Sequence, residues 1–131
     1  METAEICRKR VLAEVKKLLC VDDSAEMLSF LVDFLASDFS IVGTLSSGSS
    51  VIATAARLNP DIILLDVDLG DTNGFHVAEQ LRGSGCPARI VFLSVHESPD
   101  FVEEADALGA AGYVSKAQID RDLVKTLRNI R

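Results

Sequence analysis

Short runs of consecutive apolar residues recur along the chain and predict strands. The runs are Leu18–Val21, Ile41–Val42, Ile62–Leu65, Ile90–Leu93 and Tyr113–Val114. A strand that is buried on both faces, as in a parallel sheet, has a continuous apolar run instead of an alternating pattern. The sequence therefore predicts five buried strands.

Between these runs, apolar residues recur at helical spacing and predict amphipathic helices. The five stripes extend over Met27–Leu35, Val51–Leu58, Phe75–Leu81, Phe101–Leu108 and Leu123–Ile130. Strict alternation of strands and helices is typical of an α/β fold, in which parallel strands are connected by helices. We therefore expect a doubly wound sheet of five parallel strands with helices on both faces.

Length and composition limit the class of protein. The chain has 131 residues and a formal net charge of −7, which fits one domain and argues against a nucleic-acid-binding surface. We expect one domain over residues 17–131, preceded by an extension, 1–16, that forms a tail or a short helix. The N-terminus lacks the apolar stretch of a signal peptide, and no apolar run is long enough to span a bilayer.

The three cysteines have neither the spacing of a zinc site nor the pattern of a disulfide framework. We therefore expect a reduced, cytoplasmic protein that does not contact membranes.

Polar residues follow the predicted strands where each strand ends. Asp22 and Asp23 follow the first strand, Asp66 the third, Ser94 the fourth and Lys116 the fifth. Each has a simple explanation alone, as a helix cap, a turn residue or a surface lysine. In a doubly wound sheet, however, the carboxyl ends of the strands line the functional crevice. Together, these five side chains predict one polar site.

The residue types at this site fit phosphoryl chemistry. Crowded carboxylates repel each other unless a cation joins them, and Mg²⁺ binds carboxylates, carbonyls and phosphate oxygens. A carboxylate can attack a phosphoryl group and form an aspartyl phosphate. The charge of the transferred group could then be stabilised by the metal, by the Lys116 ammonium and by the Ser94 hydroxyl.

With these residues in place, the chain from about Lys17 to Arg131 resembles the receiver domain of two-component response regulators. The segment Pro60–Gly74 resembles the phosphoacceptor stretch of that family. Two further segments, Phe39–Gly43 and Gly109–Lys116, resemble receivers of LuxR/NarL-type regulators. The resemblance implies the CheY-like, flavodoxin-like (βα)5 fold and a role in signal transduction, not an enzyme.

The resemblance also implies roles for individual residues. Asp66 would accept a phosphoryl group from a phosphohistidine of a sensor histidine kinase or a phosphotransfer protein. Asp23 would bind the Mg²⁺ cofactor directly and Asp22 mainly through water, and the backbone carbonyl of Asp68 would complete the protein ligands. Gly70 and Ala117 stand where the family often has proline.

For the switch, the resemblance implies that Ser94 moves to the phosphoryl group, Lys116 pairs with it and Tyr113 turns inward. This local charge change would alter the surface of the fourth helix, the fifth strand and the fifth helix. Such receivers can form homodimers through that surface. They usually continue into a DNA-binding output domain, and this chain ends with its fifth helix. The chain is thus expected to be either a stand-alone receiver or part of a longer transcription regulator.

Asp68 and His96 lie two residues after Asp66 and Ser94. Both would flank the path of a hydrolysing water, so we hypothesise that they set the lifetime of the phosphorylated state. The alternative is that both are solvated loop residues.

Three other functions compete with this interpretation. Asp66-Val67-Asp68 resembles the DxD motif of haloacid-dehalogenase-type phosphatases, but it follows the third strand and has Gly70 in place of the family's threonine. A pseudo-receiver would act without phosphorylation, although such domains typically lose acidic or lysine positions that this chain keeps. A flavodoxin-like flavin protein is disfavoured because Asp22 and Asp23 would repel the flavin phosphate.

Overall fold

The computed structural model describes residues 15–130 and contains one parallel five-stranded sheet in the order β2-β1-β3-β4-β5. The strands are β1 (Lys17–Val21), β2 (Ser40–Leu45), β3 (Ile62–Asp66), β4 (Arg89–Ser94) and β5 (Gly112–Ser115). All five predicted strands are confirmed, and β2 is longer than its apolar run because it continues through Gly43 to Leu45.

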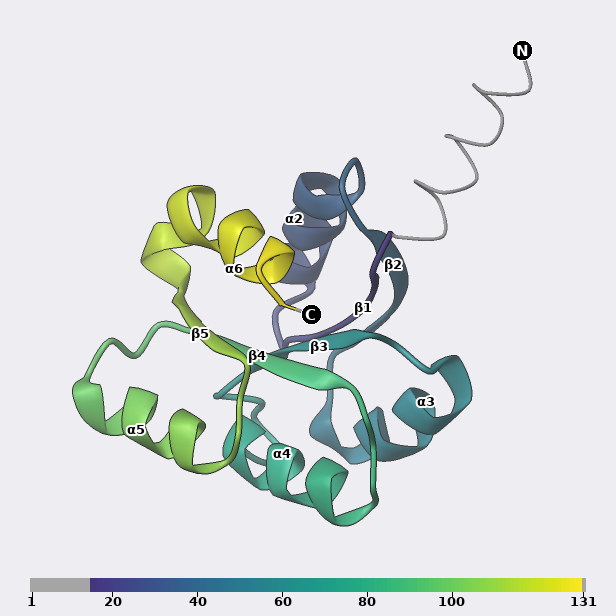
Figure 1. Cartoon of the computed structure of the whole chain (residues 1–131), viewed down its shortest axis with the longest axis vertical. Coiled ribbons are helices and arrows are strands. Elements are labelled where there is room, and N and C mark those ends of the chain that lie inside the picture. The colour runs from purple at the N-terminus through teal and green to yellow at the C-terminus, as the bar shows by residue number, and fades with distance from the viewer. Residues whose placement is uncertain (1–14, 131) are drawn as a thin grey trace.

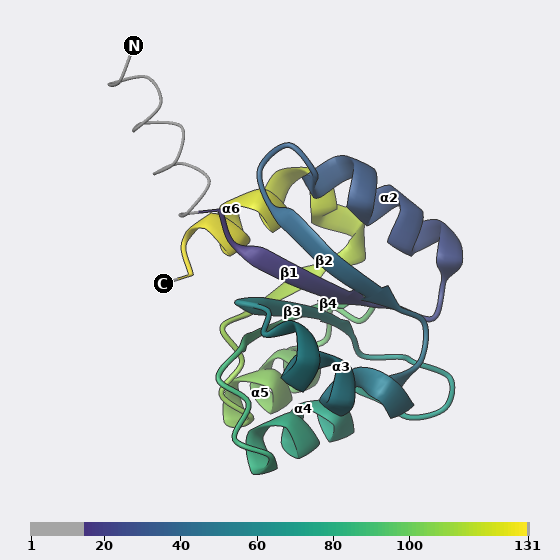
Figure 2. The same ribbon diagram turned by 90° about the vertical axis from the view of Figure 1, so that its right-hand side faces the viewer.

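Within residues 15–130, five α-helices connect or follow the strands. They are α2 (Ala25–Leu35), α3 (Val51–Leu58), α4 (Gly74–Gly83), α5 (Pro99–Ala107) and α6 (Val124–Arg128). Figures 1 and 2 show α2 and α6 on one face of the sheet and α3, α4 and α5 on the other. The predicted doubly wound α/β fold is confirmed.

Two hydrophobic cores lie on opposite faces of the sheet because alternate strand residues point in opposite directions. Leu18 and Cys20 of β1 pack towards α2 and α6, in a core that includes Leu31 and Leu127. Leu19 and Val21 belong to the other core, with residues of α3, α4 and α5. The central strands are thus apolar on both faces, which explains the continuous runs in the sequence.

Side-chain caps begin the helices close to the carboxyl ends of the strands. Ser24 accepts a hydrogen bond from the Met27 amide and caps α2, and Asn73 accepts one from His76 at the start of α4. Ser98 caps α5 in the same way, and Pro99 follows it at the first position of the helix. These caps fix where each loop ends and place the loop residues that precede them.

The C-terminal segment differs from the single helix predicted around the Leu123–Ile130 stripe. A 3₁₀ turn (Lys116–Gln118) and a π-helical turn (Ile119–Leu123) precede α6. The side chain of Lys16 donates hydrogen bonds to the carbonyls of Leu127 and Ile130, near the end of α6. Lys16, assigned to the extension from the sequence, therefore contacts the folded domain, whereas residues 1–14 of the predicted extension lie outside the described residues.

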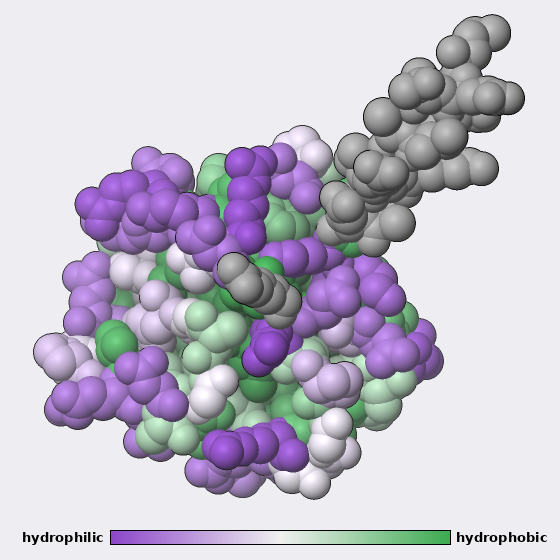
Figure 3. Space-filling model, in the orientation of Figure 1, coloured by the Kyte–Doolittle hydropathy of each residue, from purple (hydrophilic) through white to green (hydrophobic). Residues whose placement is uncertain are grey.

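The surface mixes polar and apolar residues. Figure 3 shows hydrophilic and hydrophobic residues interspersed over one face of the molecule. Among residues 15–130, no helix is long and apolar enough to cross a bilayer.

Candidate functional site

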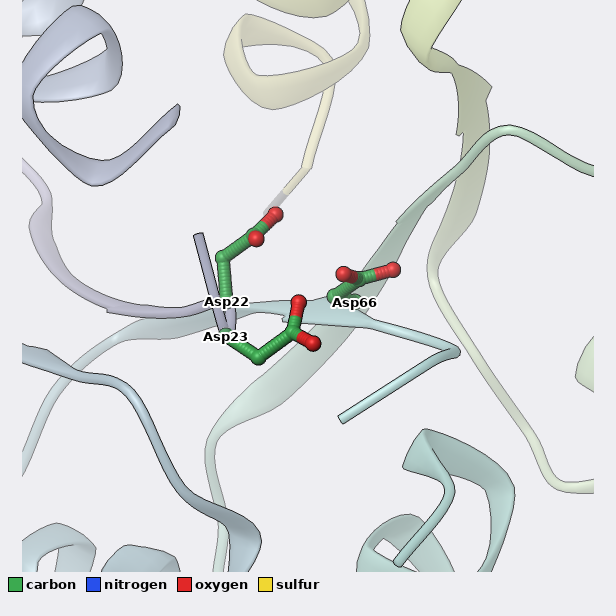
Figure 4. A group of neighbouring side chains, drawn as sticks. All are labelled: Asp22, Asp23 and Asp66. Atoms are coloured by element: carbon green, nitrogen blue, oxygen red, sulfur yellow. The ribbon is translucent and has the colours of Figure 1, made fainter. Parts of the chain in front are cut away.

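Three carboxyl groups meet at the carboxyl ends of the central strands. Asp22 and Asp23 follow β1, Asp66 ends the neighbouring β3, and oxygen atoms of all three lie within 4.8 Å of one another. Figure 4 shows the three side chains gathered around one space. Asp22 is 1% exposed and Asp66 is 3% exposed, whereas Asp23 is open to solvent. The predicted cluster is therefore present in the structure.

The Lys116 ammonium bridges the two buried carboxylates. Its ammonium lies 2.8 Å from Asp22 Oδ2 and donates a hydrogen bond of 3.0 Å to Asp66 Oδ2. Burial opposes the charged form of this lysine, but the hydrogen bonds to the two aspartates outweigh burial and raise the pKa of the ammonium. Lys116 therefore remains charged and neutralises part of the cluster.

The environment of the Asp66 carboxyl group disfavours its charged form. Burial raises its pKa to about 6, and the charge of Asp22 acts in the same direction, although the bond from Lys116 opposes both. The Asp68 amide donates a further hydrogen bond of 3.2 Å to Asp66 Oδ1. At neutral pH the group is still mostly ionised, and it is less well solvated than an exposed carboxylate.

Gly74 allows the backbone to pass directly behind Asp66. A Cβ atom at Gly74 would lie 2.3 Å from the Asp66 carbonyl oxygen, which is far inside a normal contact. The Gly74 amide also donates a hydrogen bond of 2.7 Å to the Val67 carbonyl. Glycine is therefore required here for the close approach of α4 to the end of β3.

The donor set fits a hard divalent cation. Asp22 Oδ2 is buried and accepts no hydrogen bond of normal geometry, and its close contact is the Lys116 ammonium. Three carboxylates face one ammonium, so negative charge remains in excess. Oxygen donors with excess negative charge are the environment that Mg²⁺ prefers.

Ser94, His96 and Tyr113 form a second part of the site at the end of β4. Ser94 is fully buried, and its hydroxyl accepts a hydrogen bond of 3.0 Å from the His96 amide. Tyr113, on the neighbouring β5, donates from its hydroxyl to the His96 carbonyl at 2.7 Å. Both residues with a predicted switch role therefore contact the backbone of His96.

The side chains of His96 and Asp68 contact each other, which the sequence did not predict. Their Nε2 and Oδ2 atoms lie 2.8 Å apart. The imidazole also stacks on Phe101, with ring centroids 4.2 Å apart and an interplanar angle of 5°. Both side chains still keep solvent contact, with 36% of His96 and 58% of Asp68 exposed, so the structure joins the two residues without deciding between a role in hydrolysis and a solvated loop.

A further contact, absent from the sequence interpretation, holds the loop between β3 and α4. The Asp71 carboxylate accepts hydrogen bonds from the Ser47 hydroxyl (2.8 Å) and the Gly48 amide (3.2 Å). In the same loop Gly70 has φ 77°, a conformation that proline cannot adopt. We call the contacts of Asp71 with Ser47 and Gly48 the Asp71 clamp.

Residues 18–128 match the family model described as the response regulator receiver domain. The nitrate/nitrite response regulator protein NarL of Escherichia coli strain K12 is 34% identical over 116 residues, which cover 87% of this chain and 54% of that protein. The chain spans a little over half the length of the first curated relatives that it matches.

Solved structures of receivers have the same fold. The signal receiver domain of the putative response regulator NarL from Mycobacterium tuberculosis has a TM-score of 0.80 and 26% identity, and the match covers 88% of this chain and 95% of that one. The chemotaxis protein CheY4 of Vibrio cholerae has a TM-score of 0.81 and 28% identity, with coverage of 89% and 99%.

Proposed function

The chain belongs to the response regulator receiver domain family, and from this membership we propose that Asp66 is its phosphoacceptor. The observation that carries the proposal is the buried Asp66 carboxylate, which is paired with Lys116 and lies within 4.8 Å of the carboxylates of Asp22 and Asp23. Ser94, Tyr113, Asp68 and His96 complete the site. The domain that performs this function extends over residues 17–131.

The transfer is a displacement at phosphorus. An oxygen of the ionised Asp66 carboxylate attacks the phosphorus of a phosphohistidine, and the bond between phosphorus and the imidazole nitrogen breaks. The nitrogen keeps the electron pair and takes a proton. Lys116 lies within hydrogen-bond distance of Asp66, so its ammonium is placed to offset the negative charge of the incoming group.

Mg²⁺ is the cofactor that this site would hold. Asp22, Asp23 and Asp66 would supply carboxylate oxygens, and Asp68 would supply its backbone carbonyl. When bound, Mg²⁺ would neutralise charge on the phosphoryl oxygens. The chain's own residues orient the acceptor: the Asp68 amide holds one carboxylate oxygen and Lys116 the other.

The phosphorylated state acts through the surface formed by α5, β5 and α6. Ser94 would exchange its hydrogen bond with the His96 amide for one to the phosphoryl group, and Tyr113 would follow because its hydroxyl binds the His96 carbonyl. The change would reach a partner, a second copy of the chain or an output domain through this surface. DNA would be reached only through an output domain.

The donor is a histidine kinase or a phosphotransfer protein of a two-component system in the cytoplasm. Receiver domains are signalling domains, so the chemistry of this chain is limited to its own phosphorylation and slow dephosphorylation. Asp68 and His96 set the rate of that dephosphorylation, and His96→Ala and Asp68→Asn variants with an unchanged rate would refute this role.

Uptake of a phosphoryl group from a small donor tests the proposal. The chain is incubated with acetyl phosphate with and without Mg²⁺, beside Asp66→Asn, and intact mass is measured. We expect one phosphoryl group on the wild-type chain with Mg²⁺, and none without Mg²⁺ or on Asp66→Asn. Uptake by Asp66→Asn equal to that of the wild type would contradict the proposal.

If the wild-type chain takes up nothing, binding of beryllofluoride with Mg²⁺ gives the second measurement. Binding that requires Asp66 supports a receiver that is restricted to a protein donor or hydrolyses too fast to observe. Absence of binding supports a pseudo-receiver and overturns the proposal.

A further inference from the structure

The imidazole of His96 is held at its edge and on its face. At the edge, Nε2 lies 2.8 Å from Asp68 Oδ2, and on the face the Phe101 ring stacks at 4.2 Å and 5°. Phe101 belongs to α5 and also contacts Phe75 of α4, with ring centroids 6.0 Å apart. The ring of His96 therefore rests on a side chain that is anchored between two helices.

The contact between His96 and Asp68 bridges the loops that follow β3 and β4, which are neighbouring strands. Each partner is also tied by its backbone to a residue of the proposed site. The Asp68 amide binds Asp66 Oδ1, and the His96 amide binds Ser94 Oγ. The bridge therefore lies beside the proposed acceptor, on the side of β4.

We propose that Phe101 is a positioning residue that holds the His96 imidazole against Asp68 and thereby lengthens the life of the phosphoryl group on Asp66. This inference rests on the proposed function. In hydrolysis, a water oxygen bonds to phosphorus, the bond from phosphorus to the Asp66 oxygen breaks with its electron pair left on the carboxylate, and the proton of the water passes to solvent. The closed bridge restricts the approach of that water from the side of β4.

Loss of the Phe101 ring would free the imidazole to rotate away from Asp68. Aromatic pairs stabilise a given arrangement enough to change its population by roughly two- to tenfold. We therefore expect Phe101→Leu to lose its phosphoryl group roughly two- to tenfold faster than the wild type. Phe101→Tyr keeps the aromatic face and should lose its phosphoryl group at the wild-type rate.

The experiment phosphorylates each variant with acetyl phosphate and Mg²⁺, removes the donor and follows intact mass with time. His96→Ala and the double variant His96→Ala/Phe101→Leu complete a cycle, in which Phe101→Leu should have no further effect without the imidazole. Phe30→Leu is the structural control: it removes a stacked ring from α2, on the other face of the sheet, and it should leave the rate within about twofold.

A second readout does not depend on phosphorylation. In the wild-type chain, the ring current of Phe101 should shift the His96 ring protons upfield in NMR spectra, and this shift should disappear in Phe101→Leu. His76, exposed on α4, is the internal reference because it should not change.

Three results would overturn the inference: an unchanged rate in Phe101→Leu, an equal increase in Phe30→Leu, or an effect of Phe101→Leu that persists without His96. If the wild-type chain takes up no phosphoryl group and binds no beryllofluoride, the proposed function fails first, and the inference fails with it. A phosphorylated chain with an unchanged rate in Phe101→Leu refutes the inference alone.

Discussion

The polar residues at the two ends of three strands differ in their exposure to solvent. At the amino ends of β1, β3 and β4, Lys17, Asp61 and Arg89 are exposed to solvent. At the carboxyl ends of the same strands, Asp22, Asp66 and Ser94 are between 0% and 3% exposed. The amino end shows that these strands can begin with charges that remain solvated, at little cost in free energy.

Burial of carboxylates at the carboxyl end therefore serves something other than the fold. Asp66 has a pKa raised to about 6, mainly by burial, which means that folding disfavours its charged form. A strongly perturbed carboxyl group within a cluster of polar side chains is typical of functional sites. The difference between the two ends is thus the main physical argument that the carboxyl end carries the chemistry.

Removal of the Lys116 ammonium should have the largest effect on stability. Lys116→Met would leave Asp22 and Asp66 facing each other without a cation, and we expect the free energy of unfolding to fall by about 3 kcal/mol at pH 7. The figure is at the low end for buried pairs because the lysine keeps some solvent contact. Urea denaturation measures it, and Mg²⁺ should restore part of the loss.

Arg89→Met is the matched control at the amino end. Its guanidinium is exposed, and we expect a change within about 0.5 kcal/mol. Equal losses in the two variants would remove the contrast between the ends of the strands.

The two terminal glycines of α4 test the same contrast within one helix. Gly74→Ala places a Cβ 2.3 Å from the Asp66 carbonyl oxygen, whereas a Cβ at Gly83 has nothing within 4 Å. We expect Gly74→Ala to lose about 2 kcal/mol of stability, as overpacked sites do, and Gly83→Ala to be neutral or slightly more stable. Thermal denaturation of both variants measures this difference, and similar midpoints would contradict the structure at this point.

The raised pKa of Asp66 predicts a pH dependence of stability. Because the folded carboxyl group, with a pKa of about 6, binds its proton more tightly than the unfolded one, the contribution of Asp66 to stability decreases as the pH rises from about 4 to about 6. Asp66→Asn should remove this decrease and be more stable than the wild type by about 1–2 kcal/mol at pH 7, with no such gain at pH 4. Denaturation at both pH values measures it.

Asp61→Asn, at the exposed amino end, is the control and should change stability by less than about 0.5 kcal/mol. A gain in Asp66→Asn that does not depend on pH would contradict the assigned cause.

The smallest predicted effect concerns the Asp71 clamp. Its hydrogen bonds tie the loop that carries the Asp68 carbonyl to the loop after β2. We expect Asp71→Asn to weaken Mg²⁺ binding by about tenfold, the low end for residues that orient metal ligands without touching the ion. Titration calorimetry measures the affinity, and Asp106→Asn, on exposed α5, should bind Mg²⁺ as the wild type does.

The sequence was sufficient for the strands and for the acidic cluster because both follow from local patterns. Apolar runs mark strands buried on both faces, and polar residues within two positions of the ends of those runs lie at one edge of a parallel sheet. The sequence therefore predicts that the side chains of Asp22, Asp66 and Lys116 lie together.

Other contacts could not be predicted from such patterns. The Asp71 clamp joins residues 24 positions apart, and the stacking of His96 on Phe101 depends on how α5 packs against the sheet. Helical periodicity assigns Phe101 to a buried face, but it does not identify the ring that covers it. The π-helical turn over Ile119–Leu123 lies almost entirely before the predicted apolar stripe, and no local pattern in the sequence indicates it.

The position of the phosphoryl group tests the central claim most directly. After incubation with acetyl phosphate and Mg²⁺, borohydride reduces an aspartyl phosphate to homoserine, and peptide mass spectrometry locates the altered residue. We expect homoserine at position 66 and nowhere else in the chain. Homoserine at Asp22, Asp23 or Asp68 instead would contradict the assignment of the buried, lysine-paired carboxylate as the acceptor.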